Sequence, residues 1–155
     1  MRSLRIVGLV VVALVAGVLA ASCGSSQSST SSSSPKSANG KITVQSTETL
    51  SAQDVTNGGV AGTGHSTISG AIADAGAVTD YRTVKGNTAL IRRVVAGSRG
   101  TITFLITIQL GTPSPEKWTI TSGTSTYKDL HGKGLETVDN FAATPATFTL
   151  VGTVS

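Results

Sequence analysis

Residues 101–110, TITFLITIQL, alternate between apolar and polar side chains along almost their whole length. The apolar residues at every second position are Ile102, Phe104, Ile106, Ile108 and Leu110. Successive side chains of a β-strand point to opposite faces, so this pattern predicts a strand with one buried face. Since no window of the chain keeps a 3.6-residue period over a helix length, the sequence predicts an all-β domain.

Seven further segments are rich in Val, Ile or Thr, which fit the pleated surface of a sheet. They are residues 41–50, 66–73, 79–85, 88–96, 118–122, 135–140 and 146–154. Clusters rich in Gly, Pro or Asn separate them, and we expect turns at residues 57–59, 62–64, 97–100, 111–115 and 132–134. About eight short strands with short connections predict a small antiparallel closed β-barrel, with a two-sheet sandwich as the alternative. The interior of such a barrel is filled by side chains or holds one small ligand.

The first 22 residues have the features of a secretory leader. Met1–Arg5 is short and basic, and Ile6–Ala21 is an unbroken apolar run of sixteen residues. A membrane-spanning helix needs about 20 apolar residues, so we prefer a cleaved signal peptide to an uncleaved membrane anchor.

The end of this leader, Leu19-Ala20-Ala21-Ser22-Cys23, resembles the lipobox of bacterial lipoproteins. The chain departs from the usual pattern in having Leu four residues before Cys23, with Ala20 at the more usual Leu position. The resemblance implies cleavage after Ser22 and a diacylglyceryl thioether on Cys23, so the expected partner is membrane lipid. It places the protein in the cell envelope, on the outer face of the cytoplasmic membrane or on an outer membrane where the host has one.

Residues 23–40 are expected to form a disordered linker behind the lipidated cysteine. Nine of the seventeen residues in Gly24–Gly40 are Ser, and almost none could be buried to offset the entropy of ordering. A Gly/Ser-rich chain of this length spans roughly 20–25 Å. The folded domain is then predicted to be residues 41–155.

Charge and cysteine content exclude several classes of function. Without Arg2 and Arg5 of the leader, the chain has ten basic and eight acidic residues. This excess of positive charge is too small to indicate nucleic-acid binding. The single Cys excludes an intrachain disulfide and a Cys-rich zinc site. The two histidines, His65 and His131, have no carboxylate or thiol at a ligand spacing, so we expect exposed imidazoles, no metal and no cofactor.

Arg92 and Arg93 lie inside an apolar strand segment, on opposite faces if the strand is regular. One of them then points inward, where a charge persists only when it is paired. The expected partners are Asp80 or Glu136. The preferred interpretation is a structural ion pair or a β-bulge, and the alternative is an arginine that binds an anionic ligand in the barrel.

Residues 118–137, WTITSGTSTYKDLHGKGLET, resemble a segment of small bacterial proteins related to the allene oxide cyclase and dirigent barrels. The matching positions are Trp118, Ile120, Gly123, Thr124, Tyr127, Leu130, Gly132 and Gly134. The resemblance implies a barrel strand, a tight turn over the barrel mouth and the start of the next strand. Ser125 stands where this group usually has Gly, so we expect no strict need for a positive φ there.

Four residues are candidates for ligand binding: Trp118, Tyr127, Arg92 and Arg93. For the two aromatic residues the alternative is a plug in the core of the barrel. Ser125 and Lys128 fit an S-x-x-K pattern, but its partner motifs are absent, so no catalytic residue is assigned.

The expected function is a membrane-anchored envelope lipoprotein whose barrel binds a small hydrophobic or amphipathic ligand or a surface partner. The alternatives are a cyclase- or isomerase-type enzyme acting in the barrel lumen and a structural surface lipoprotein with a filled barrel. An open cavity of about 300 Å³ or more, lined by Trp118, Tyr127 and an inward Arg, would favour binding or catalysis. A filled lumen would favour the structural alternative, with these residues as the filling: Phe104, Ile106, Ile120, Phe148 and Leu150.

Overall fold

The computed structural model describes residues 38–155, apart from residues 53, 54 and 114. The predicted leader, Cys23 and most of the predicted linker lie outside the described residues. The described chain contains eight strands and one short 3-10 helix, η1. Their bounds are β1 Gly40–Leu50, β2 Asn57–Gly70, β3 Asp74–Lys85, β4 Thr88–Gly97, β5 Gly100–Gln109, β6 Glu116–Gly123, η1 Ser125–Tyr127, β7 Gly132–Asn140 and β8 Ala146–Val154.

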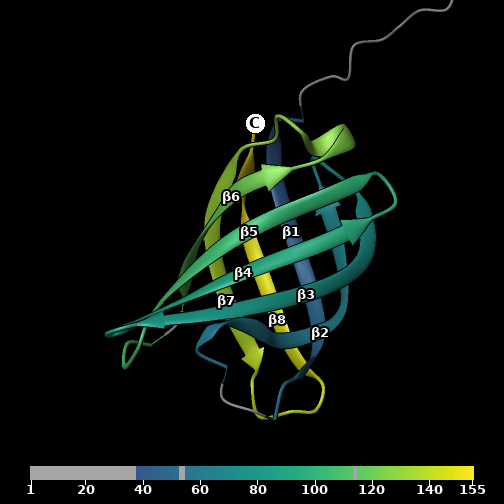
Figure 1. The fold of residues 1–155 in the computed structure, drawn as a ribbon. Helices are drawn as coiled ribbons and strands as arrows, with labels where there is room; N and C mark the ends of the chain where they lie inside the picture. The colour runs from purple at the N-terminus through teal and green to yellow at the C-terminus, as the bar shows by residue number, and fades with distance from the viewer. Residues whose placement is uncertain (1–37, 53–54, 114) are drawn as a thin grey trace, which may run out of the picture. The chain divides into compact units, whose positions relative to one another are not determined.

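The strands form a closed barrel in chain order, and the last strand pairs with the first (Figure 1). All pairs are antiparallel, and β8 closes the barrel on β1 with Gly40 opposite Val154. The predicted all-β barrel of eight strands is therefore confirmed, and the sandwich is not found. No helix in the described part of the chain is long and apolar enough to cross a membrane.

The alternation that predicted β5 corresponds to the inside and outside of the barrel. Ile102, Phe104 and Ile106 point inward and are at most 1% exposed. Ile108 continues the inward face but is only partly buried, because it lies toward the end of the barrel that is not filled. Ser98 and Arg99 form the predicted hairpin turn between β4 and β5.

Two of the predicted turns are wrong, because residues 57–59 and 62–64 belong to β2. The glycines in these two segments let β2 pack closely against β1 and let the register between β2 and β3 shift. A Cβ on Gly62 would lie 2.8 Å from Oε2 of Glu48, and one on Gly64 would overlap the backbone carbonyl of Thr47. Gly58 has φ +78° where the β2–β3 register shifts. Since β2 ends at Gly70 and β3 already begins at Asp74, their connection is shorter than expected.

The predicted turn at residues 132–134 is also wrong, because β7 begins at Gly132. Here glycine makes room for an aromatic ring. A Cβ on Gly134 would lie 2.7 Å from Cζ2 of Trp118, and one on Gly152 would lie closer still. The indole ring therefore packs directly against the backbones of β7 and β8.

An apolar core fills the half of the barrel where β1 begins and β8 ends. Trp118 is central to it: its ring meets that of Phe104 edge-on, 5.5 Å between centroids and at 81°. The indole Nε1 donates a hydrogen bond to the carbonyl oxygen of Leu135 at 3.1 Å. The core includes Ile42, Val44, Ile68, Val78, Val95, Ile102, Phe104, Ile106, Ile120, Leu130, Leu150 and Val154.

Candidate ligand-binding cavity

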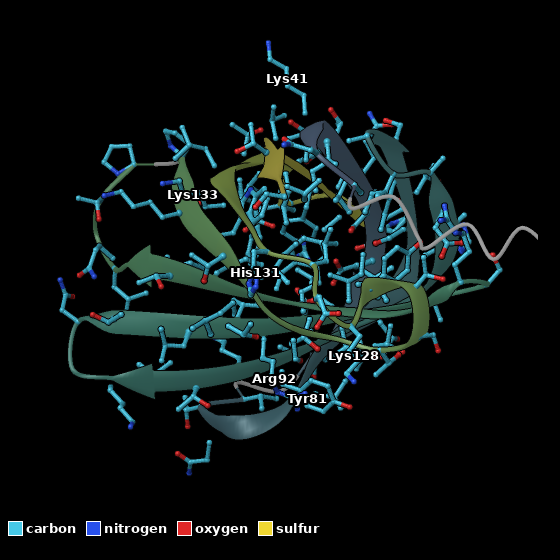
Figure 2. All side chains as sticks on the ribbon, turned by 90° about the horizontal axis from the view of Figure 1, so that it is seen from above. Lys41, Tyr81, Arg92, Lys128, His131 and Lys133 are labelled. Carbon is cyan, nitrogen blue, oxygen red and sulfur yellow. The ribbon has the colours of Figure 1, made fainter. Side chains whose placement is uncertain are left out.

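The two adjacent arginines of β4 point to opposite sides of the barrel wall, as the alternation predicted. Arg93 points inward and is 1% exposed, whereas Arg92 is exposed, with its guanidinium 4.0 Å from the ring centroid of Tyr81. Figure 2 shows Arg92 beside Tyr81 on one outer side of the barrel. The pairing of β4 with β3 and β5 has no register shift at these residues, so the β-bulge alternative is not found.

Arg93 is held by both of its predicted partners. Its Nε and Nη2 donate to the two carboxylate oxygens of Asp80 at 2.9 and 2.8 Å. The register of β3 and β4 places these two residues directly opposite each other. Nη1 donates to Oε1 of Glu136 on β7, at 2.6 Å. The predicted ion pair is therefore confirmed, with both carboxylates engaged at once.

A third carboxylate, that of Glu48 on β1, was not anticipated. Its Oε1 lies 3.0 Å from Nη2 of Arg93, and its side chain is fully buried. Neither Glu48 carboxylate oxygen has a hydrogen-bond partner among the described residues. The sequence did carry a signal for this residue, because Glu48 continues the inward phase set by Ile42 and Val44.

Three carboxyl groups around one guanidinium leave the buried cluster with an excess of negative charge. Burial raises the pKa of Glu48 to about 8, assisted by the Asp80 carboxylate and opposed by Arg93. Burial likewise raises the pKa of Glu136 to about 7, with Arg93 opposing it and Asp80 assisting. Burial works against the charge on Arg93, but the three carboxylates more than compensate and raise its pKa. The two glutamates of the cluster therefore take up protons at a higher pH than ordinary carboxyl groups, while Arg93 stays charged.

This ionic cluster forms the floor of a cavity of about 450 Å³ at the end of the barrel where β1 ends and β8 begins. Arg93, Asp80 and Glu136 face it from the floor, and its lining also includes the charged side chains of Arg82 and Glu116. The walls are mainly apolar, formed by Leu50, Val55, Ala61, Ala89, Ile91, Ile108, Leu110, Val138, Phe141 and Phe148. Cavities of this size with apolar walls and a few convergent polar groups are typical of small-molecule sites.

The predicted site residues are not brought together. Of the four, Arg93 alone lines this cavity; Trp118 is buried in the apolar core, and Arg92 is on the outer surface. Tyr127 lies in η1 at the opposite end of the barrel, beside a second hollow with Arg99 and Lys128. Its hydroxyl donates to Oδ2 of Asp74 at 2.8 Å. The described residues therefore form no single cavity lined by Trp118, Tyr127 and an inward Arg, and the cavity that is present is lined by the inward Arg without the two aromatic residues.

The connection between β6 and β7 contains the expected tight turn, with one correction. Ser125 has φ +51°, so the backbone does adopt the left-handed conformation where glycine is usual. That region is open to non-glycine residues at a modest cost, which is why Ser125 can occupy it. Ser125 and Lys128 are both exposed there, and the S-x-x-K pattern has no buried nucleophile.

His65 and His131 are exposed, as predicted. Within residues 38–155, as far as they are described, no group of three or more His, Cys, Asp or Glu side chains could hold a metal ion.

The closed antiparallel barrel of eight strands is like that of a dirigent protein. The structure is similar to that of a pterocarpan synthase dirigent protein, with a TM-score of 0.54 and 12% sequence identity. The match covers 86% of this chain and 98% of that one. This likeness shows the fold alone. No protein-family model matches the sequence, and no curated protein matches it.

Proposed function

We propose that the barrel binds a small amphipathic molecule in the cavity above Arg93. The observation that carries the proposal is the combination of about 450 Å³ of space, apolar walls and a charged floor. An apolar ligand body would replace water against these walls, at roughly 25 cal/mol per Å² of apolar surface buried. The dirigent protein of similar fold is by its name a synthase, which supports a barrel of this kind as a site for small molecules.

The charges on the floor favour a ligand whose polar end is cationic or neutral. The donors of Arg93 already face Asp80, Glu136 and Glu48 at 2.6 to 3.0 Å. An anion would meet these carboxyl groups, and in a buried site that repulsion is weakly screened. An amine would instead supply the positive charge that the cluster lacks and would keep Glu136 ionised.

Native mass spectrometry of the full chain, purified from its own membrane in mild detergent, tests the cavity. We expect a retained small molecule in the wild type and its loss in Ala89→Trp, because Ala89 is buried and lines the cavity. Ala96→Trp is the matched control, with the same substitution on the same strand at an exposed position. Decylamine should displace the retained molecule better than decanoate does. Equal retention in all three proteins, or preferential displacement by decanoate, would contradict the proposal.

A second candidate function is proton-transfer catalysis of the isomerase or cyclase type. It is favoured by Glu136, which lines the cavity and whose pKa burial raises to about 7. A carboxyl group that titrates near neutral pH can donate or accept a proton during a reaction. Glu136→Gln should then abolish turnover of the retained molecule while its binding persists. Loss of binding together with turnover would point to a binding role.

We further propose that the barrel is held at the cell envelope by a lipid on Cys23. Two or more acyl chains on one residue give a stable anchor, since each buried methylene contributes about 0.8 kcal/mol. In the native host, the wild-type chain should incorporate labelled fatty acid, and Cys23→Ala should remain unlabelled and unprocessed. Ser22→Ala keeps a small residue before the cysteine and is the control that should still be labelled. Labelling of Cys23→Ala would contradict the anchor.

A further inference from the structure

Two of the four large apolar side chains that are exposed in the described part of the chain lie side by side on the outer wall of the barrel. Leu135 on β7 is 48% exposed and Val151 on β8 is 51% exposed. They lie directly opposite each other in the β7–β8 register, so they form one continuous apolar spot. Scattered single exposures are common on protein surfaces, whereas these two adjoin and make one small apolar patch.

Three lysines surround this spot. Lys117 lies opposite Leu135 in the β6–β7 register. Lys133 precedes Leu135 by two residues on the same face of β7, and it lies opposite Thr153. Lys41 lies opposite Thr153 from the other side, on β1. The basic patch is therefore a compact surface made of Lys41, Lys117, Lys133, Leu135 and Val151.

The patch has a net positive charge. All three lysines are exposed, and in the described part of the chain none of them is in an ion pair with a carboxylate. The nearby Asp139 carboxylate accepts a hydrogen bond from Oγ1 of Thr149 at 2.6 Å, two residues from Val151. The patch and its surroundings thus carry three positive charges from lysine and one negative charge from Asp139. Figure 2 shows Lys41 and Lys133 on one side of the barrel, with Tyr81 and Arg92 on the opposite side.

The N-terminal end of β1 lies beside this patch, because Lys41 belongs to both. Lys41 is the second residue of β1, and residues 1–37 precede the first described residue by sequence. An anchor at Cys23 would therefore tether the barrel by the end at which Lys41 and Lys133 lie. The cavity above Arg93 lies at the other end, where β1 ends.

We infer that the basic patch is a membrane-contact surface that docks the barrel wall on anionic phospholipid. Lysine ammonium groups bind lipid phosphates, and an apolar pair between them enters the boundary between headgroups and acyl chains. The inference rests on the proposed lipid anchor, which holds the patch near the bilayer. It assigns an orientation to the barrel, with the β7–β8 wall toward lipid and the Tyr81 wall away from it.

Tryptophan quenching by brominated lipid tests this orientation in the full, lipidated chain. Leu135→Trp places a reporter in the patch, and Tyr81→Trp is the matched control on the opposite wall. The native Trp118 is buried, so its signal is measured in the wild type and subtracted. Each protein is reconstituted into vesicles of brominated phosphatidylcholine, with or without phosphatidylglycerol.

We expect quenching of Leu135→Trp in the anionic vesicles, with little quenching of Tyr81→Trp. Quenching should be lost in vesicles without phosphatidylglycerol, and also when Lys41, Lys117 and Lys133 are all changed to Gln. Equal quenching of the two reporters would overturn the proposal that the basic patch contacts lipid. The absence of quenching in a chain that still sediments with the vesicles would do the same. Neither result would contradict the lipid anchor at Cys23. A chain absent from the vesicle fraction would overturn both proposals. A concentration-dependent blue shift of Leu135→Trp without vesicles would overturn lipid docking in favour of a second copy.

Discussion

Arg93 and Asp80 meet side-on inside the barrel, through Nε to Oδ1 at 2.9 Å and Nη2 to Oδ2 at 2.8 Å. The two residues are opposite each other on β3 and β4, so the strand register itself aligns the planar guanidinium with the carboxylate. A lysine could not reproduce these paired bonds, because its ammonium group acts as a point charge. This pair fixes the position of the guanidinium, and burial raises the pKa of both glutamates that also contact it.

Removing the Arg93 charge should destabilise the fold strongly. Arg93→Met leaves three buried carboxyl groups without their counter-charge, and we expect a loss of about 3–5 kcal/mol in the free energy of unfolding at pH 8. The loss should be smaller at pH 5, where Glu48 and Glu136 are protonated. Urea denaturation at the two pH values measures both quantities.

Arg92→Met is the control for that experiment. Arg92 is on the same strand but exposed, where its contact with Tyr81 contributes about 0.5–1 kcal/mol. Similar losses in the two variants would contradict the view that Arg93 neutralises a buried cluster.

Because the pKa values of Glu48 and Glu136 are raised in the fold, we expect the free energy of unfolding to fall as the pH rises. The pKa of Glu48 is about 8 in the fold against an ordinary value of 4.5, so the folded state binds more protons between these values. Stability from this residue is therefore fully present below about pH 4.5 and is lost as the pH rises through about 8. Glu48→Gln should flatten this dependence and raise the free energy of unfolding at pH 8 by about 1–2 kcal/mol.

Chemical denaturation of the wild type and of Glu48→Gln at intervals from pH 5 to pH 9 measures the effect. Asp129→Asn, at an exposed position in the β6–β7 connection, serves as a control for the loss of one negative charge. Parallel curves for the wild type and Glu48→Gln would show that Glu48 is ionised in the fold throughout this range.

The backbone at Gly62 should be coupled to the Glu48 carboxyl group. A Cβ at position 62 would lie 2.8 Å from Oε2 of Glu48 and 3.2 Å from Cδ2 of Leu50. Gly62→Ala therefore pushes on the ionic cluster, and we expect a loss of about 1–3 kcal/mol, typical of overpacking. In a Glu48→Ala background the same change should cost much less. A double-mutant cycle gives the coupling, and additive losses would show that the two positions act independently.

The alternation of apolar and polar residues predicted most of the fold, because successive side chains of a barrel strand point alternately to the inside and to the outside. The same rule predicted that one of Arg92 and Arg93 points inward, and the need to pair a buried charge predicted Asp80 and Glu136. What the sequence did not indicate is the use of glycine inside strands. Gly62 and Gly134 resemble turn residues, but they are strand positions where a side chain or an indole ring takes the space of a Cβ.

The position of the cavity was also beyond sequence reasoning. Both halves of the barrel are lined by apolar residues, and their side-chain volumes decide which half is full. Trp118 and Phe104 fill one half, whereas the other has Ala61 and Ala89 along its walls. Tyr127 is buried in the hydrophobic core, as the plug alternative predicts, and its hydroxyl donates to Asp74, a residue that no local pattern connects to it.

Asp74 should give the protein a second pH dependence, of opposite sign to that of Glu48. Although burial works the other way, hydrogen bonds from Tyr127, Ala75, Ser98 and Arg99 hold the pKa of Asp74 well below its ordinary value of 3.8. The stability that Asp74 contributes is present above about pH 4 and falls away in stronger acid. Tyr127→Phe removes the hydroxyl donor and should cost about 1 kcal/mol at pH 7, with less difference from the wild type at pH 2. Thermal unfolding at both pH values tests this, with Tyr81→Phe as the control, because Tyr81 is a partly buried tyrosine on the outer wall. A Tyr127→Phe deficit of the same size at both pH values would mean that the lost packing of the hydroxyl, rather than its bond to an ionised Asp74, carries the effect.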